Sequence, residues 1–344
     1  MSERDVASRP IASRPEHLFG DERPFAQCHA STVVATPGDG LLVAWFGGTR
    51  EGHPDVGIWA SSWDGRSVPG DPDAGWSAPR PIAKVADEPH WNPVLFARSP
   101  DRRELVLHFK VGRRIRRWQT WFQRSTDAGR SWSAAEPLVP RDRGGRGAVR
   151  CKPIRLASGA WLAGASRERW KRWDAFVDRS PDGLGGWRAA RPIAIDRARF
   201  QGKGLIQPTL WESAPGHVHA LLRSTDGRVH RSDSSDDGHS WSPAHPIDVP
   251  NNNSGLDVVR LEDGLLALAC NPVPGNWAPR SPLSVLFSRD NGHVWSDRID
   301  LETDPGEFSY PAIIAVPGGL VVSYTWNRRR IAVARLGADE IPAP

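Results

Sequence analysis

The sequence repeats one short phrase at a nearly constant interval. A serine, an aspartate, a glycine and a tryptophan stand at fixed offsets in Ser125–Trp132, and the pattern returns in Ser234–Trp241 and Ser288–Trp295. Two degraded copies occur in Ser180–Trp187, where Leu184 takes the place of the glycine, and in Asp73–Trp76. Successive tryptophans of the five copies are 54 to 56 residues apart. A fixed period of this length indicates a repeat architecture.

The residue types of the phrase indicate a self-fastened turn. Serine and aspartate side chains bond backbone N–H groups within a turn, glycine adopts the positive φ that other residues resist, and tryptophan is buried between neighbouring repeats. A catalytic residue does not have to occur once per repeat. The phrase is therefore predicted to be scaffold, not active site.

A second phrase, a turn followed by an apolar strand, occurs six times. Its copies are Gly40–Trp45, Glu104–Phe109, Gly159–Ala163, Gly216–Leu222, Gly264–Leu268 and Gly318–Tyr324. Short apolar runs bounded by glycine and proline read as strands buried between stacked sheets. The 344 residues divided by the period give six repeats. We therefore predict an all-β fold, a six-bladed β-propeller formed by one domain over residues 1–344, with almost no helix.

The two ends of the chain carry a further prediction. The sixth strand phrase has no turn phrase after it, so the last sheet lacks one strand. The stretch around Ile11 to Leu18 is expected to supply that strand and close the ring, which protects the sheet edges. Residues 1–8 are expected to be disordered.

One polar position per repeat precedes the innermost strand and is often followed by proline. These positions are His29, Asn92, Lys152, Gln207, Ser254 and Tyr310. The innermost strands of a propeller line its central channel, so the six side chains are predicted to form a ring at one mouth. Buried polar groups without partners cost about 1–3 kcal/mol each. The ring therefore favours a ligand floor, although the six residues could instead satisfy one another and channel waters.

Loops after the second phrase are predicted to form an outer tier at the same mouth. Arg223 and Arg280 each lie shortly before an intact turn phrase, and two planar guanidinium groups on adjacent repeats suit one carboxylate. The tier also contains Arg167–Glu168 and four other candidates, namely Glu51, Asp55, Asn271 and Trp326.

Charge and cysteine usage restrict the partners and the compartment. The net charge is +5, but the basic residues are scattered among 40 acidic ones, which argues against a nucleic-acid partner and leaves room for an anionic ligand. The three cysteines are far apart, so neither a disulfide framework nor a zinc site is indicated, and no other metal or cofactor is expected. The polar N-terminus and the lack of a membrane-length apolar run predict a cytoplasmic protein without a membrane partner.

The turn phrase resembles the Asp-box, or bacterial neuraminidase repeat, of the sialidase superfamily. In that family three arginines bind the sialic acid carboxylate, a glutamate-activated tyrosine is the nucleophile, and an aspartate is the acid and base. The resemblance assigns Arg223 and Arg280 to the second and third arginines, Tyr310 to the nucleophile, and Glu51 or Asp55 to the acid and base.

Two positions depart from the family pattern. His29 stands where the first arginine is expected, and Gln207 stands where the activating glutamate is expected. Glutamine does not accept the tyrosine proton. The ring would also suit a different reaction, in which His29 acts as base and Tyr310 as acid on a uronate.

Three functions therefore stay open for a protein whose partner is a glycan with an anionic sugar. The first is an exo-α-sialidase-like glycoside hydrolase that removes a terminal anionic sugar. The second is a rhamnose- or glucuronate-type lyase, or a rhamnosidase, that uses His29. The third is a non-catalytic binding propeller in which Tyr310 and Trp326 stack a sugar and Asn92, Lys152, Gln207, Ser254 and Asn271 form hydrogen bonds.

Overall fold

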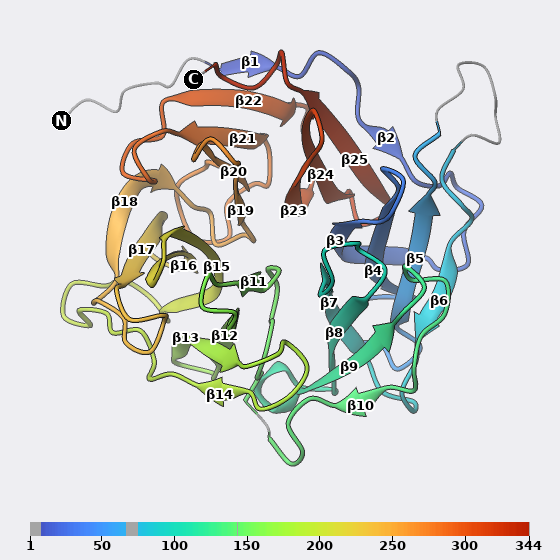
Figure 1. Cartoon of the computed structure of the whole chain (residues 1–344), viewed down its shortest axis with the longest axis horizontal. Coiled ribbons are helices and arrows are strands. Elements are labelled where there is room, and N and C mark those ends of the chain that lie inside the picture. Colours follow the sequence, from blue (N-terminus) through green and yellow to red (C-terminus); the bar gives the residue numbers. More distant parts are fainter. Residues whose placement is uncertain (1–7, 67–74, 143, 344) are drawn as a thin grey trace.

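Six β-sheets surround a central axis in the computed structural model (Figure 1), which describes residues 8–66, 75–142 and 144–343. Blade 1 comprises β3 (Gln27–Ala35), β4 (Leu41–Gly48), β5 (Gly57–Trp63) and β6 (Arg80–Ala83). Blade 2 comprises β7 (His90–Ala97), β8 (Leu105–Val111), β9 (Gln119–Ser125) and β10 (Glu136–Pro137). Blade 3 comprises β11 (Ile154–Arg155), β12 (Trp161–Glu168), β13 (Trp173–Ser180) and β14 (Arg188–Ala189). The prediction of a six-bladed β-propeller is confirmed.

The other three blades complete the circle. Blade 4 comprises β15 (Leu205–Ala214), β16 (His217–Ser224), β17 (Arg228–Ser234) and β18 (His245–Pro250). Blade 5 comprises β19 (Asp257–Arg260), β20 (Leu266–Cys270), β21 (Leu283–Ser288) and β22 (Asp297–Glu302), and blade 6 contains β23 (Phe308–Val316), β24 (Gly319–Trp326) and β25 (Arg330–Gly337). In the described residues the single helical element is the 3₁₀ turn η1 (Ile115–Arg117), and no helix is long and apolar enough to cross a membrane.

The N-terminal segment closes the ring across two blades. Strand β2 (Glu16–His17) pairs antiparallel with β25 and completes blade 6, as predicted. Strand β1 (Ser8–Pro10) adds a fifth strand to blade 5, parallel to β22, which the sequence analysis did not anticipate. The expected disorder falls mostly on residues 1–7, which lie outside the described residues, whereas Ser8 already belongs to β1.

The Asp-box turns connect the third and fourth strands of blades 2 to 5 and hold themselves together. In blade 2, Ser125 Oγ donates to Asp127 Oδ1 (2.7 Å) and accepts from the N–H of Gly129 (2.8 Å). Gly129 has φ +85°, and a Cβ there would lie 2.5 Å from Leu42 of the preceding blade. Glycine is therefore needed both for the turn conformation and for the contact between blades.

In the degraded turn of blade 3, Leu184 stands at the offset of the glycine, and Gly183 takes over the bond to the serine. Ser180 Oγ accepts from the N–H of Gly183 (3.0 Å), and Gly183 has φ +79°. Gly183 corresponds to Ala128 of blade 2, which is also left-handed, but the bond to the serine comes one residue earlier than in blade 2. In blade 1, Asp73 lies outside the described residues, and Trp76 Nε1 donates to Glu16 of β2 (3.1 Å).

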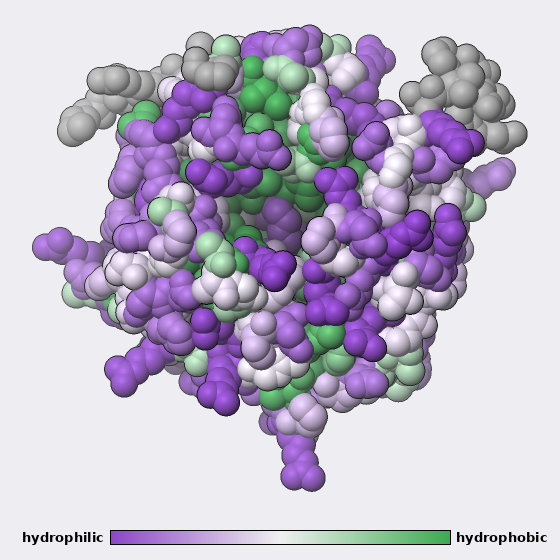
Figure 2. All heavy atoms as spheres, viewed as in Figure 1, coloured by the Kyte–Doolittle hydropathy of each residue, from purple (hydrophilic) through white to green (hydrophobic). Residues whose placement is uncertain are grey.

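Strand register places the Asp-box turns and the polar ring at opposite ends of the channel. In blade 2, Ala97 at the end of β7 pairs with Leu105, which pairs with Ser125 at the start of the Asp-box turn. The other end of the same sheet holds Trp91, beside Asn92, and its partner Lys110. Apolar side chains fill the space between neighbouring blades, for example Leu42 and Ala44 with Leu105 and Leu107. Figure 2 shows the molecule hollowed at its centre, with a mainly hydrophilic rim.

Candidate active site at the channel mouth

A β-bulge with a left-handed residue recurs near the start of four inner strands. The strand register shifts between His29 and Thr32, Trp91 and Val94, Ile206 and Thr209, and Ser309 and Ala312. The left-handed residues inside these bulges are Ala30, Asn92, Gln207 and Tyr310, with φ between +39° and +57°. Positive φ in non-glycine residues costs free energy and concentrates at functional sites.

The six ring positions are not structurally equivalent, contrary to the prediction. In blade 1 the bulge residue is Ala30, and His29 comes one residue earlier in the register. In blades 3 and 5 the innermost strands begin at Ile154 and Asp257, after Lys152 and Ser254. Of the six predicted positions, Asn92, Gln207 and Tyr310 therefore share one structural position, the left-handed residue of the bulge.

Tyr310 lies at the centre of a group of cations. Its hydroxyl accepts a hydrogen bond from Arg223 Nη1 (3.1 Å). The guanidinium carbons of Arg150, Arg223 and Arg280 lie 5.1, 5.9 and 5.7 Å from the centroid of its ring. These arginines come from blades 3, 4 and 5, so the fold brings both predicted arginines to Tyr310 and adds a third.

Neighbouring side chains fix the orientation of the two predicted arginines. Arg223, at the end of β16, donates from Nε to Asn253 Oδ1 (2.8 Å) and from Nη1 to Gln207 Oε1 (3.1 Å). Arg280 donates from Nη1 to Glu307 Oε1 (2.9 Å). Gln207 thus supports Arg223 in the position where the family pattern has a carboxylate for the tyrosine.

His29 lies directly against Tyr310. The two ring centroids are 4.3 Å apart, and Nδ1 of His29 lies 3.1 Å from Thr325 Oγ1. Burial lowers the pKa of His29 well below its usual value, and the charges of Arg328, Arg280, Arg150 and Arg223 lower it further. The imidazole is therefore neutral near pH 7.

The two carboxylates predicted as acid and base occupy different settings. Asp55 accepts hydrogen bonds from the N–H of Thr49 (3.0 Å) and from the hydroxyl of Thr49 (2.5 Å), and it contacts His53. Burial opposes ionisation of Asp55, but these hydrogen bonds outweigh it and lower its pKa. Glu51 instead forms an ion pair with Arg328, which also binds Glu307.

Three predicted binding residues have structural partners at the mouth or beyond it. Asn271 Nδ2 donates to the carbonyls of Arg280 (3.0 Å), Pro282 and Phe308, which anchors the Arg280 segment to the start of β23. Ser254 Oγ donates to Asn271 Oδ1 (3.0 Å). Trp326 packs edge-on against His17 of the outer strand β2.

Lys152 does not belong to the group around Tyr310. Its ammonium donates to Asp257 Oδ2 and to the carbonyl of Val258, both at 2.9 Å. It lines a small cavity together with Ala35 and Ala97, which end their inner strands. The side chain therefore extends into the channel, where the Asp257 carboxylate neutralises it.

Several residues at the mouth were missed by the sequence analysis. Arg150 is fully buried and donates to the carbonyl of Pro311. It stands two residues before Lys152, the residue that the X-Pro pattern selected in this blade. Arg328 also lies at the mouth, where it pairs with Glu51 and Glu307. Trp277 is 64% exposed and lies over Arg223, whose guanidinium carbon is 5.8 Å from its ring. Exposure of a tryptophan beside a buried arginine has no signature in sequence.

Glu168, which sequence analysis placed only in the outer tier, has a raised pKa. Burial raises its pKa, although the charge of Arg223 opposes this effect, and Ser166 Oγ donates to Glu168 Oε1 (3.3 Å).

In the described residues, no group of three or more His, Cys, Asp or Glu side chains could hold a metal ion.

Comparison with known protein families and structures places this geometry in context. The family model described as BNR repeat-like domain matches residues 39–322. The chain belongs to this family. No curated protein matches the chain.

Solved structures of the same fold share little sequence with this chain. The Hadza microbial sialidase Hz136 superposes with a TM-score of 0.75 at 14% identity, covering 95% of this chain and 69% of that one. The NanB sialidase from Streptococcus pneumoniae gives 0.75 at 12% identity, covering 99% and 73%. A protein of unknown function from Dyadobacter fermentans gives 0.72 at 15% identity, covering 94% and 98%. At these identities the likeness establishes the fold alone.

Proposed function

We propose that this BNR-repeat protein is an exo-acting, sialidase-like glycoside hydrolase that removes a terminal carboxylated sugar from a glycan. The observation that carries the proposal is the constellation at Tyr310: a hydroxyl held by Arg223, three guanidinium groups around the ring, and a neutral histidine against its face. The sialidases among the structural neighbours support the reaction class.

The arginines serve first to bind the sugar carboxylate. The guanidinium groups of Arg223 and Arg280 both approach Tyr310, and a guanidinium binds a carboxylate through two parallel hydrogen bonds. The side chain of Arg280 is 14% exposed and is already paired with Glu307, so the ligand would share this arginine with Glu307. Trp277, exposed beside Arg223, offers an apolar face to the sugar ring.

The same cations support Tyr310 as nucleophile. As the tyrosine oxygen forms its bond to the anomeric carbon, Arg150, Arg223 and Arg280 stabilise negative charge on the phenol, which a glutamate at position 207 would not do. His29 takes the phenol proton at Nε2 while Nδ1–H donates to Thr325 Oγ1. The glycosidic C–O bond breaks, and water later releases the sugar from Tyr310.

Protonation of the leaving oxygen requires an acid, and Glu168 suits this role better than Asp55. The raised pKa of Glu168 keeps it protonated to higher pH, whereas the lowered pKa of Asp55 keeps it ionised. Replacement of Glu168 by glutamine should slow release of poor leaving groups more than release of aryl leaving groups, because an aryl oxide needs little protonation to depart.

A second function, β-elimination from a uronate, is favoured by Gln207. In that reaction His29 removes the proton at C5, Tyr310 protonates the leaving oxygen, and a C4–C5 double bond forms. Arg223 bonds both Gln207 and Tyr310, so no carboxylate at position 207 takes the Tyr310 proton, and the hydroxyl can give it to the leaving oxygen.

The products distinguish these two reactions from a binding-only propeller. The protein would be incubated with aryl sialosides, aryl glucuronides and uronate-containing oligosaccharides, and both aryl release and ultraviolet absorbance of an unsaturated uronate would be followed. A saturated free sugar supports hydrolysis, and a new absorbance supports elimination in its place. Binding of these sugars with no product under either assay would overturn the enzymatic proposal.

A further inference from the structure

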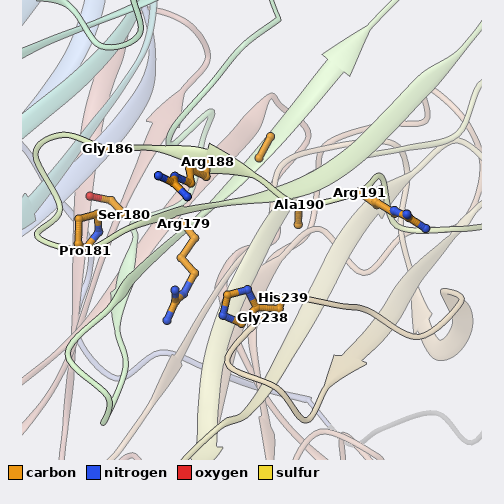
Figure 3. Close-up of a pocket in the computed structure, with 10 residues that line it drawn as sticks. Arg179, Ser180, Pro181, Gly186, Arg188, Ala190, Arg191, Gly238 and His239 are labelled. Atoms are coloured by element: carbon orange, nitrogen blue, oxygen red, sulfur yellow. The ribbon is translucent and has the colours of Figure 1, made fainter.

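A basic cleft opens between blades 3 and 4, at the end of the molecule opposite to Tyr310. It has a volume of about 610 Å³ and lies between β13, the segment around β14 and the Asp-box turn of blade 4 (Figure 3). Its basic lining residues are Arg179, Arg188, Arg191 and His239. Neither the mouth nor the proposed reaction uses any of them.

At the cleft, the seam between blades differs from two other seams in how its Asp-box carbonyl is bonded. Between blades 1 and 2, Arg80 donates to the Asp-box carbonyl of Gly129, and between blades 4 and 5, Arg231 donates to the carbonyl of Asn291 (2.7 Å). Between blades 3 and 4, the carbonyl of Gly238 accepts from Trp241 of its own turn (3.0 Å). Arg179 instead contacts the next blade through a long ion pair with Asp237 (3.7 Å).

The positive charges in the cleft are incompletely neutralised. Arg179 reaches the carboxylate of Asp237 at 3.7 Å, which is a long ion pair. Among the described residues, Arg188 and Arg191 form no ion pair, and both are exposed. Arg188 pairs with Arg179 across the two strands, which fixes two guanidinium side chains side by side on the sheet.

We propose that this cleft is a second binding site, for the carboxylate or sulfate groups of an acidic oligosaccharide. Arginine presents planar, paired donors that match both anions. The volume lies within the range of pockets that hold small ligands. Pro181, Ala189 and Ala190 provide small apolar surfaces for sugar rings between the charges. The inference is independent of the reaction at Tyr310.

The lining favours a glycan over a nucleic acid. None of the ten residues that line the cleft is Phe, Tyr or Trp, whereas single-stranded nucleic acids bind with their bases stacked on such rings. Asp237 at the edge of the cleft also opposes a densely charged phosphate backbone. A glycan with spaced anionic groups can place them on the arginines and avoid this carboxylate.

Calorimetric titration of the full-length protein tests the site. The protein would carry Arg280→Ala, so that the mouth does not mask the cleft, and the probes would be an oligogalacturonate, a chondroitin sulfate oligosaccharide and an uncharged oligosaccharide of equal length. We expect at least one acidic probe to bind and the uncharged one not to bind. Arg188→Ala with Arg191→Ala should weaken that binding about tenfold, as the loss of two charge-assisted contacts implies. The preferred acidic probe identifies carboxylate or sulfate as the ligand group.

A control pair keeps the test specific. Arg124→Ala with Arg130→Ala removes the same charge from exposed positions at the equivalent turn of blade 2 and should leave binding unchanged. If both pairs of substitutions weakened binding equally, the effect would come from net charge, and the proposal of a specific site would be overturned. Unchanged affinity in the cleft variant would overturn it as well, as would tighter, cleft-dependent binding of a single-stranded oligonucleotide.

Discussion

The two ends of the propeller are built on different principles. At the Asp-box end, the Ser–Asp hydrogen bond recurs at 2.7, 2.8 and 2.8 Å in blades 2, 4 and 5, within turns of eight residues. At the mouth, Arg223 bonds Tyr310 across 87 residues and Arg150 bonds Pro311 across 161. Repetition therefore builds the scaffold, and contacts that occur once in the chain build the site.

Left-handed residues other than glycine occur at both ends of the propeller. Each intact Asp-box turn has one directly before its glycine, namely Ala128, Asp237 and Asn291. The bulges at the mouth place Ala30, Asn92, Gln207 and Tyr310 in this conformation, at a cost of order 1–3 kcal/mol each. At the mouth the left-handed residue Tyr310 lies among the guanidinium groups of three arginines.

The largest expected effect is on turnover, and it should distinguish the two tyrosines of the chain, Tyr310 and Tyr324. Tyr310→Phe should reduce turnover at least about 1,000-fold, equivalent to about 4 kcal/mol of activation free energy, because the nucleophilic or proton-donating oxygen is lost. Its melting temperature should change little. Steady-state kinetics and thermal unfolding check both statements.

The control for this variant is Tyr324→Phe. The hydroxyl of Tyr324 donates to Glu302 (2.6 Å), so its loss should lower stability and leave turnover per folded molecule intact. If Tyr310→Phe retained full activity on every substrate of the wild-type protein, Tyr310 would have no catalytic role.

The contributions of the mouth and of the Asp-box turns to stability should also change with pH in different ranges. Burial lowers the pKa of Lys110, on the mouth side of blade 2, from 10.5 to about 7. Between these values the unfolded chain binds a proton that the folded chain does not, so stability should rise with pH by up to about 1.4 kcal/mol per unit. Lys110→Met should remove this slope and stabilise the protein near pH 7. Denaturant titrations at several pH values measure it.

The exposed Lys171 is the matched control for Lys110, since Lys171→Met should preserve the slope. At the Asp-box end the slope has the same sign but lies at acidic pH. Hydrogen bonds from Ser131 lower the pKa of Asp127 to about 2, so this contribution is present above pH 3.8 and is lost as pH falls toward 2. A slope that survived in the Lys110→Met variant would mean that Lys110 is charged in the folded protein.

Removal of one Asp-box carboxylate should destabilise the fold without altering the site. Asp127→Ala deletes acceptors for the N–H of Ser131 (2.9 Å) and for the hydroxyls of Ser131 (2.5 Å) and Ser125 (2.7 Å). At about 1 kcal/mol per hydrogen bond, the free energy of unfolding should fall by about 2–3 kcal/mol. Thr126→Ala in the same turn is the control. A loss of turnover per folded molecule in the Asp127 variant would show that the two ends are coupled.

The sequence predicts the scaffold well because the bonds that define it are local. Ser125, Asp127, Gly129 and Trp132 interact within one turn, so their spacing alone predicts the turn and, through its period, the six blades. Closure by β2 also follows from a simple count, because the sixth sheet lacks a strand. The additional pairing of β1 with β22 does not follow, since a three-residue parallel edge has no sequence signature.

The mouth was predicted in part, for a physical reason. X-Pro dipeptides mark Asn92, Gln207 and Tyr310, because proline follows the left-handed residue in each bulge. Blade 1 has Ala30 and Ser31 at these positions, so the prediction rested on His29, which is one residue off in register although it lies beside Tyr310. Arg150 and Arg328 reach the site through long side chains from other blades, and only three-dimensional placement reveals such contacts.

The smallest expected effect compares two exposed apolar side chains, one at each end. Trp277 is 64% exposed beside Arg223, and Val294 is 59% exposed in the Asp-box turn of blade 5. Trp277→Ala should weaken binding of a carboxylated sugar about five- to tenfold, or about 1 kcal/mol, because a sugar loses its stacking face while the arginines remain. Val294→Ala should leave binding unchanged, and neither variant should unfold at a lower temperature, since both side chains face solvent. Titration of each variant with the same sugar measures the difference. If both variants bound the sugar as tightly as the wild type does, the arginines alone would account for recognition, and Trp277 would lie outside the site.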